Sequence, residues 1–90
     1  MKTTIRKLEQ QLKAVANARR LGILAYLKKK EDATVGNTAN AVRSSIQTAS
    51  QHLRILKAAG IVEYKRRAKY VTYRLSLKQE EPIKKIIALL

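Results

Sequence analysis

The chain has 90 residues, and its 20 Lys and Arg against 6 Asp and Glu give a net charge of +14. A chain of this length predicts one domain, residues 1–90, with a small core. The hydrophobic content of 46% excludes wholesale disorder, and the absence of cysteine excludes disulfides and thiolate-bound metal. The excess of cations favours a polyanionic partner, either nucleic acid or an acidic membrane surface.

The first 30 residues predict two helices. Thr3 or Thr4 precedes the first helix and Asn17 precedes the second, and such side chains are favoured N-caps because they accept backbone N–H bonds. The apolar residues of the first helix recur at heptad-like spacing, at Ile5, Leu8, Leu12 and Val15. The buried side of the second helix is predicted to consist of Leu21, Ile23, Leu24 and Leu27.

Two further helices are predicted before residue 60. Thr34 is the expected cap of a short third helix, whose apolar residues are Val35, Ala39 and Val42. Ser44 or Ser45 caps a fourth helix over residues 45–59. Gly60 then suits the left-handed position at which helices commonly end.

The fourth helix has two contrasting halves. At about 100° per residue, one half is apolar and contains Ile46, Ala49, Leu53, Leu56 and Ala59, with Ile55 at its margin. The other half carries Gln47, Ser50, Gln51 and Arg54. Ordinary solvated faces are rich in Glu, yet residues 44–59 contain no acid. Gln and Arg form paired hydrogen bonds with adenine and guanine edges, so we predict that this face contacts nucleic acid.

Residues 61–75 alternate with a period of two and predict a β-hairpin with its tip at residues 66–69. The tip region gathers four cations, namely Lys65, Arg66, Arg67 and Lys69. Such a cluster repels itself unless counter-charge arrives, so a phosphate backbone is the natural partner. Aromatic residues of a hairpin can stack on single-stranded bases. We predict instead that they pack it against the third and fourth helices, through Tyr64, Tyr70 and Tyr73.

A last helix is predicted from Pro82, which suits a first helical turn. Its apolar stripe consists of Ile83, Ile86, Ile87 and Leu90. The stripe covers its own domain, lies on a membrane, or forms a dimer seam with Ile5, Leu8 and Leu12. A small monomer core favours the seam, and a stripe of about two turns is short for membrane binding.

The elements together predict a mainly α fold with a small β-hairpin, a winged helix-turn-helix in the order α-α-α-α-β-β-α. A groove-reading helix is followed by a basic hairpin that reaches the neighbouring phosphates. One His, scattered acids and no glycine-rich phosphate loop leave no catalytic constellation, so neither an enzyme nor a cofactor is expected. Two alternatives remain open, a nonspecific architectural nucleic-acid coat and a protein-interaction module.

Four stretches, in order between residues 12 and 75, carry a family resemblance: "LKAVANARRLGILAYL", "TVGNTANAV", "TASQHLRILKAAGIV" and "YKRRAKYVTYRL". In them the chain resembles the ArsR-like family of small winged helix-turn-helix transcriptional repressors. The resemblance implies a homodimer built from the first and last helices, which binds palindromic double-stranded DNA. It adds Ser45 and Thr48 to the predicted DNA contacts. It also implies DNA contacts for the wing residues Arg66, Arg67 and Lys69, which their charge had already indicated. Because no apolar run approaches the roughly 20 residues of a membrane span, a cytoplasmic, nucleoid-associated protein without a membrane partner is expected.

The chain also departs from the family pattern. The family's thiolate sensor would place cysteines at Thr34 and Gly36, so sensing of soft metals by that motif is excluded. Its other metal site needs His and acids on the last helix, where this chain has only Glu80 and Glu81. His52 alone cannot form a metal site, and a core or groove-edge role is expected. The family often has Gly where Ala68 stands, which leaves the conformation of the wing turn open.

Overall fold

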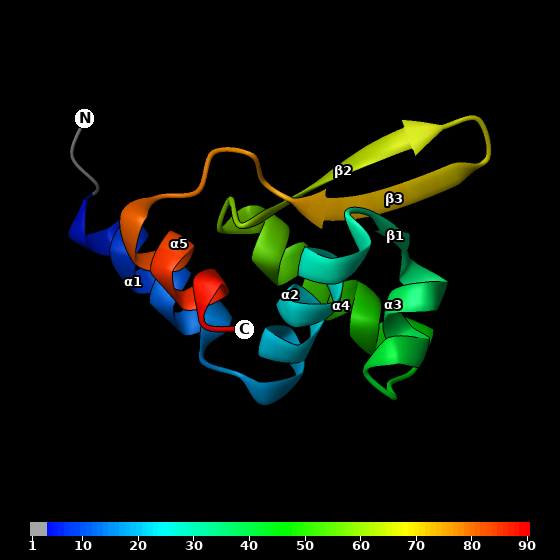
Figure 1. Cartoon of the computed structure of the whole chain (residues 1–90), viewed down its shortest axis with the longest axis horizontal. Helices are drawn as coiled ribbons and strands as arrows, with labels where there is room; N and C mark the ends of the chain where they lie inside the picture. Colours follow the sequence, from blue (N-terminus) through cyan, green and yellow to red (C-terminus); the bar gives the residue numbers. More distant parts are fainter. Residues whose placement is uncertain (1–3) are drawn as a thin grey trace.

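The computed structural model describes residues 4–90 and shows five helices and three strands within them (Figure 1). In chain order they are α1 (Ile5–Val15), α2 (Ala18–Lys30), β1 (Ala33–Thr34), α3 (Val35–Ala41), α4 (Ile46–Ala58), β2 (Val62–Arg67), β3 (Tyr70–Leu75) and α5 (Glu81–Ala88). The predicted mainly α fold, with a hairpin between the fourth and fifth helices, is confirmed.

Polar side chains start four of the helices by accepting a backbone N–H bond from the first turn. The caps are Thr4, Asn17, Thr34 and Ser45, at 3.0–3.1 Å from their donors. Ser45 is therefore the cap of α4 rather than Ser44, and Thr3 lies outside the described residues. These caps fix where each helix begins, because unsatisfied N–H groups at helix starts are costly.

The sheet contains a strand that the sequence did not predict. Ala33 and Thr34 pair antiparallel with Tyr73 and Thr72 of β3, which gives the strand order β1-β3-β2. A two-residue strand has no periodicity of its own and forms only because the hairpin lies beside it. This pairing joins the start of α3 to the hairpin, so it fixes the position of the helix-turn-helix relative to the wing.

The core lies between α2, α4, the base of the hairpin and α5. Its largest fully buried side chains include Ile23, Leu24, Leu27, Leu53, Leu56, Ile61 and Ile83. The carbonyl end of α5 is held against α2, because Lys28 Nζ donates to the Ile87 oxygen over 3.1 Å. Burial of aliphatic side chains at about 25 cal/mol per Å² of apolar surface is the main stabilising contribution.

Two of the residues that the sequence predicted at the dimer seam are buried inside their own chain. Ile83 is 0% exposed and Ile87 is 8% exposed, both within the core of their own chain. Ile86 is half-buried against the same core. Helical spacing identifies an apolar side but not what covers it, and here α5 covers its own domain.

The tyrosine prediction holds for only part of the hairpin. Tyr73 is buried and meets the ring of Tyr64 edge-on at 5.8 Å, whereas Tyr64 remains about half exposed. Tyr70 is 65% exposed, so its predicted packing against the helices is wrong. It lies three residues from Tyr73, and side chains an odd number of residues apart point to opposite faces of a strand.

Among the described residues, positive φ angles occur at Glu31, Arg43, Gly60 and Ala68, and the last two bear on the sequence predictions. Gly60 ends α4 with a φ of 77°, as predicted. Ala68 has a φ of 49° in the two-residue turn between Arg67 and Tyr70. The wing turn thus adopts the conformation that Gly favours, although Ala occupies it.

The hairpin projects past the helices at one end of the molecule, and α1 and α5 lie beside each other toward the other end (Figure 1). Among residues 4–90, no helix has the length and apolar character that a membrane span requires.

Candidate nucleic-acid interface

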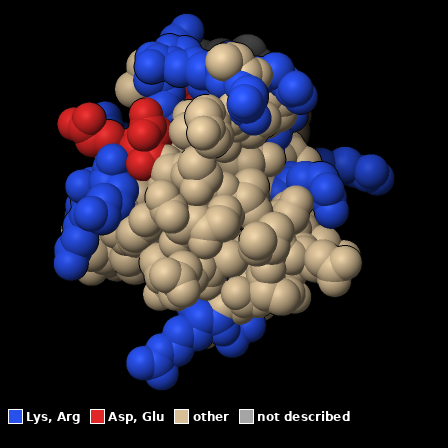
Figure 2. Space-filling view, turned by 90° about the vertical axis from the view of Figure 1, so that its right-hand side faces the viewer, with Lys and Arg blue, Asp and Glu red and all other residues tan. Residues whose placement is uncertain are grey.

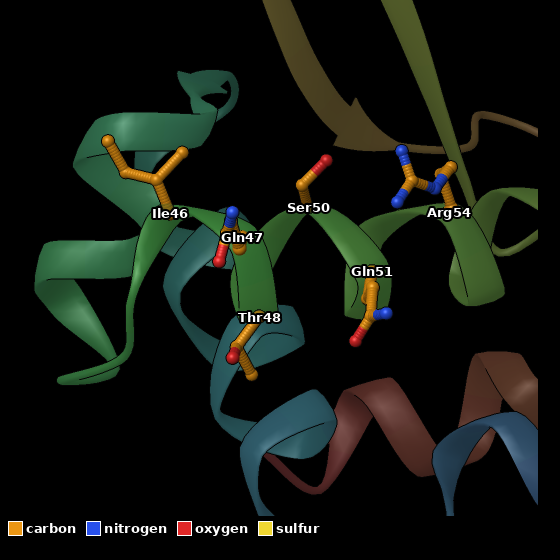
Figure 3. A pocket seen from close by; sticks show the side chains of 6 residues that line it. All are labelled: Ile46, Gln47, Thr48, Ser50, Gln51 and Arg54. Atoms are coloured by element: carbon orange, nitrogen blue, oxygen red, sulfur yellow. The ribbon is translucent and has the colours of Figure 1, made fainter.

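The outer face of α4 carries the four predicted reading residues on one continuous surface. Gln47, Gln51 and Arg54 are exposed and Ser50 is partly exposed. Together with Ile46 and Thr48 they line a shallow open hollow along the helix (Figure 3). The opposite face is fully buried through Ala49, Leu53 and Leu56. Apart from Ile46, the predicted division of this helix into two faces is therefore confirmed, and its outer face is open to solvent.

Ile46 belongs to the outer face rather than to the core. The sequence placed it on the apolar half, but it is 62% exposed and lines the hollow beside Gln47. It is the first residue of α4. An isoleucine directly after an N-cap is the signal that sequence reasoning missed, because a first turn often lacks a neighbour to cover it.

The start of α4 presents hydroxyl groups that are already engaged. Ser45 Oγ accepts from the Thr48 backbone N–H and lies 3.0 Å from Thr48 Oγ1. Ser45 is exposed and Thr48 is partly exposed. The two predicted contacts at the helix start therefore serve first as the cap of α4, and their remaining hydrogen-bonding capacity faces solvent.

The four wing cations are all exposed and lie on the hairpin beyond the helices. The register pairs Lys65 with Thr72, Arg66 with Val71 and Arg67 with Tyr70. Since neighbouring residues of a strand point to opposite faces, Lys65 and Arg67 share the outer face, and Arg66 shares the inner face with Tyr64. The sequence grouped these cations together, but the sheet distributes them over both faces of the ribbon.

The wing charge is uncompensated by acids within the described residues. Glu63 is the one acid of the hairpin, and its Oε2 accepts from Arg74 Nε at 2.7 Å. Figure 2 shows Lys and Arg gathered over the hairpin at the top, further Lys and Arg at the sides and bottom, and one patch of acids at the left; these groups surround a broad area without charged residues. This face thus combines an uncharged centre with a mainly cationic margin.

Contacts from two other elements hold the carbonyl end of α4 in place. Gln10 Nε2 donates to the Ala58 oxygen and Gln11 Nε2 donates to the Ala59 oxygen, each over 3.3 Å. Gln11 is 3% exposed, and these bonds satisfy carbonyls that a helix end leaves without partners. Lys57 Nζ lies 4.7 Å from the centre of the Tyr64 ring, which joins α4 to the wing. α4 is therefore fixed to both α1 and β2.

His52 lies at the edge of the outer face and is half-buried. Its Nδ1 is 3.1 Å from Arg20 Nη1. Burial, followed by the nearby charges of Arg20 and Arg19, lowers the pKa of His52 below its usual value. No group of three His, Asp or Glu side chains comes together among residues 4–90.

Several predicted seam residues remain on the surface. Ile5 is 86% exposed, Leu12 is 44% exposed and Leu90 is 39% exposed, whereas Leu8 is partly buried. Leu89, which the sequence reading did not include, is 85% exposed. An apolar surface therefore exists on α1 and after α5, although Ile83 and Ile87 do not contribute to it.

Comparison with protein families finds a match to the helix-turn-helix domain over residues 15–65. A cadmium resistance transcriptional regulatory protein CadC homologue of Staphylococcus aureus is 36% identical over 75 residues, which are 83% of this chain and 60% of that protein. The transcriptional activator HlyU of Vibrio cholerae is 42% identical over 65 residues, which are 72% of this chain and 59% of that protein. The chain thus spans about three fifths of the length of these two relatives.

Solved structures give the same result over more of the chain. A homodimeric winged helix-turn-helix DNA-binding domain of Mycobacterium bovis, a possible ArsR-family regulator, has a TM-score of 0.80 and 33% identity, covering 94% of this chain and 75% of that one. A structure of HlyU from Vibrio cholerae has a TM-score of 0.79 and 35% identity, covering 99% and 92%.

Proposed function

The chain belongs to the ArsR family of winged helix-turn-helix transcriptional regulators, and on this premise we propose that it binds specific double-stranded DNA and regulates transcription by occupying a promoter. In the proposal α4 enters the major groove, and the β2–β3 hairpin lies on the flanking phosphates. The observation that carries the proposal is the acid-free outer face of α4 beside four uncompensated wing cations.

The chemistry of the α4 face suits base edges. Arg54 can donate two hydrogen bonds to guanine O6 and N7, and Gln47 or Gln51 can pair with adenine N6 and N7. Ile46 adds an apolar group that fits the methyl group of thymine. Ser45, Thr48 and Ser50 are assigned to phosphates or base edges near the start of the helix. A face with several different donors and one apolar contact can discriminate sequences, which charge alone cannot.

We further propose that two copies act together on a palindromic site. The seam is assigned to α1 and the chain after α5, through Ile5, Leu8, Leu12 and Leu90, with Ile86 at its edge. The Mycobacterium bovis domain is described as homodimeric, which supports this arrangement without fixing its details. Two recognition helices related by a twofold axis would meet major grooves about 34 Å apart.

Regulation by soft metals through thiolates is not part of the proposal. One relative is described as a cadmium resistance regulator, but this chain has no cysteine, with Thr34 and Gly36 at the positions of the family's sensor motif. Thiolates are the ligands that such ions prefer. We propose repression relieved by another signal or by protein concentration.

The test is selection of bound duplexes from a random-sequence pool, followed by competition between the selected duplex and random duplex at moderate salt. A specific regulator prefers the selected duplex by about 10³-fold or more. Recovery of a palindrome supports the dimer. Equal affinity for both duplexes would favour the nonspecific coat, and no binding in low salt would favour a protein-interaction module.

A further inference from the structure

Arg20 joins three elements through one side chain. Its Nε donates to the Ala14 oxygen over 2.6 Å and its Nη2 donates to the Lys13 oxygen over 3.3 Å, so it satisfies carbonyls at the end of α1. Its Nη1 lies 3.1 Å from Nδ1 of His52 on α4. Arg20 itself belongs to α2. One guanidinium therefore ties the reading helix to the end of α1 through a planar fork that can make these bonds together.

The bond to His52 requires a neutral imidazole. A guanidinium has only donors, so Nδ1 must accept, and the ring proton then resides on Nε2. When the ring is protonated, both of its nitrogens are donors, and Nδ1–H would face the Arg20 Nη1 donor without an acceptor between them. Burial and the charges of Arg20 and Arg19 lower the pKa of His52 and so favour the neutral ring at neutral pH.

His52 lies next to the side chains that read the groove. It lines a second surface hollow together with Gln51, Arg54, Ile55 and Ala58, on the flank of the outer face. The same helix is held at its carbonyl end by Gln10 and Gln11 of α1. The contacts from α1 and α2 thus set the position of α4 at its middle and at its end.

We propose that Arg20 and His52 are positioning residues for DNA reading, and that protonation of His52 releases this tie and weakens specific binding. The inference rests on the proposed function, because it concerns the accuracy with which Gln51 and Arg54 meet base edges. It concerns specific binding only, since phosphate contacts of the wing tolerate small shifts of α4.

The charges around His52 give the proposal a definite direction. Arg19 and Arg20 of α2 act on the ring, and Arg54 of α4 lines the same hollow. On α1, the Lys13 ammonium pairs with Glu9 at 3.7 Å. A protonated ring therefore meets cations and no free acid at these positions. Plain electrostatics predicts that an additional cation near DNA tightens binding. Our proposal predicts the opposite for the selected duplex.

The experiment measures the affinity of the full chain for the selected duplex and for random duplex, from neutral pH down to about pH 5, at fixed salt. For the wild type we expect affinity for the selected duplex to fall about tenfold on acidification, the effect of losing one hydrogen bond to a charged group. On acidification, the affinity for random duplex is expected to stay unchanged or to rise.

Two variants of His52 separate its roles. His52→Asn places an amide oxygen near the position of Nδ1 and does not titrate, so it should keep the neutral-pH affinity and lose the pH dependence. His52→Leu lacks an acceptor, and its affinity for the selected duplex should be about tenfold weaker at every pH.

A matched pair of variants on α2 controls for net charge. Arg20→Gln and Arg19→Gln each remove one cation, but only Arg20→Gln breaks the tie to His52 and should lose specific affinity.

A readout without DNA keeps the inference separate from the proposed function. On pH titration, backbone amide shifts of residues 51–55 should follow the midpoint of the His52 ring in the wild type. The proposal is overturned if the ring titrates while these amides stay unchanged, if His52→Asn titrates like the wild type, or if the affinity for the selected duplex rises on acidification. If no duplex is preferred at neutral pH but the amides follow the ring, the proposed function fails and the tie between Arg20 and His52 stands.

Discussion

The wing cations allow a quantitative test of the proposed contacts between the hairpin and DNA phosphates. Arg67→Ala removes one cation from the outer face of the hairpin, and Arg66→Ala removes one from the inner face. Neither residue has an ion-pair partner among residues 4–90, because the acid of the hairpin, Glu63, is occupied by Arg74. Each substitution therefore removes a charge that only DNA phosphates are expected to neutralise.

The magnitude follows from counterion release. Each neutralised phosphate contributes about 0.9 to the slope of log affinity against log salt concentration, so four wing contacts account for a slope of about −3.6. Raising salt fourfold should weaken binding about 3.5-fold for each contact. Arg66→Ala and Arg67→Ala should each flatten the slope by about one unit, and the double variant by about two.

The assay is equilibrium binding at several salt concentrations with the selected and the random duplex. Because phosphates carry no sequence, both duplexes should lose affinity equally. Lys84→Ala is the matched control, since it removes one exposed cation from α5, away from the hairpin, and should leave the slope unchanged. A variant that weakens only the selected duplex, or a slope that Arg67→Ala leaves unchanged, would contradict the phosphate role of the wing.

Further predictions concern reading, turn geometry, assembly and pH. Arg54→Ala should weaken the selected duplex by about 1–3 kcal/mol and relax the preference at one base pair; equal loss on random duplex in a competition assay would argue against base contact. Ala68→Gly should raise the free energy of unfolding by about 0.5–1 kcal/mol. A φ of 49° costs a residue with a Cβ about 1–2 kcal/mol, and removal of this strain is partly offset by the greater entropy that Gly gives the unfolded chain. A melting curve that shows destabilisation would refute this account. Leu12→Lys should shift sedimentation toward monomer without unfolding, since the residue is 44% exposed; an unchanged dimer would reject this part of the seam. The pKa of His52 is lowered in the folded chain, so the unfolded chain binds more protons as pH falls below about 6.5. The free energy of unfolding should therefore decrease there for the wild type but not for His52→Asn. Equal loss in both proteins would assign the effect to another group.

The sequence predicted those features that local chemistry decides. Caps such as Asn17 and Ser45 act within one turn, and Gly60 adopts the left-handed backbone that its missing Cβ allows. The polar outer face of α4 was predictable for the same reason, because helical spacing groups residues that share a side. Assignment of the fold then followed from the order of elements.

Features that depend on a neighbour were not predictable in this way. Whether an apolar residue is covered depends on what packs over it, so Ile46 was expected in the core and is exposed, whereas Ile83 was expected at a seam and is buried. The strand at Ala33 exists only because β3 lies beside it. The bond between Arg20 and His52 joins residues 32 positions apart and leaves no local pattern in the sequence.

The distribution of charge explains how a strongly basic domain can still be selective. In the proposed function, uncompensated cations on the wing give affinity for any duplex, and that affinity falls as salt rises. Selectivity then comes from groups whose bonds depend on the base, and on α4 we propose Gln47, Gln51 and Arg54 with the apolar Ile46 for this role. Such bonds need side chains placed to within a fraction of an ångström, which loose attachment of α4 would prevent. If the proposed function holds, the ties of α4 to α1, α2 and β2 serve specificity and the exposed cations serve affinity, so substitutions in the two groups should separate these properties.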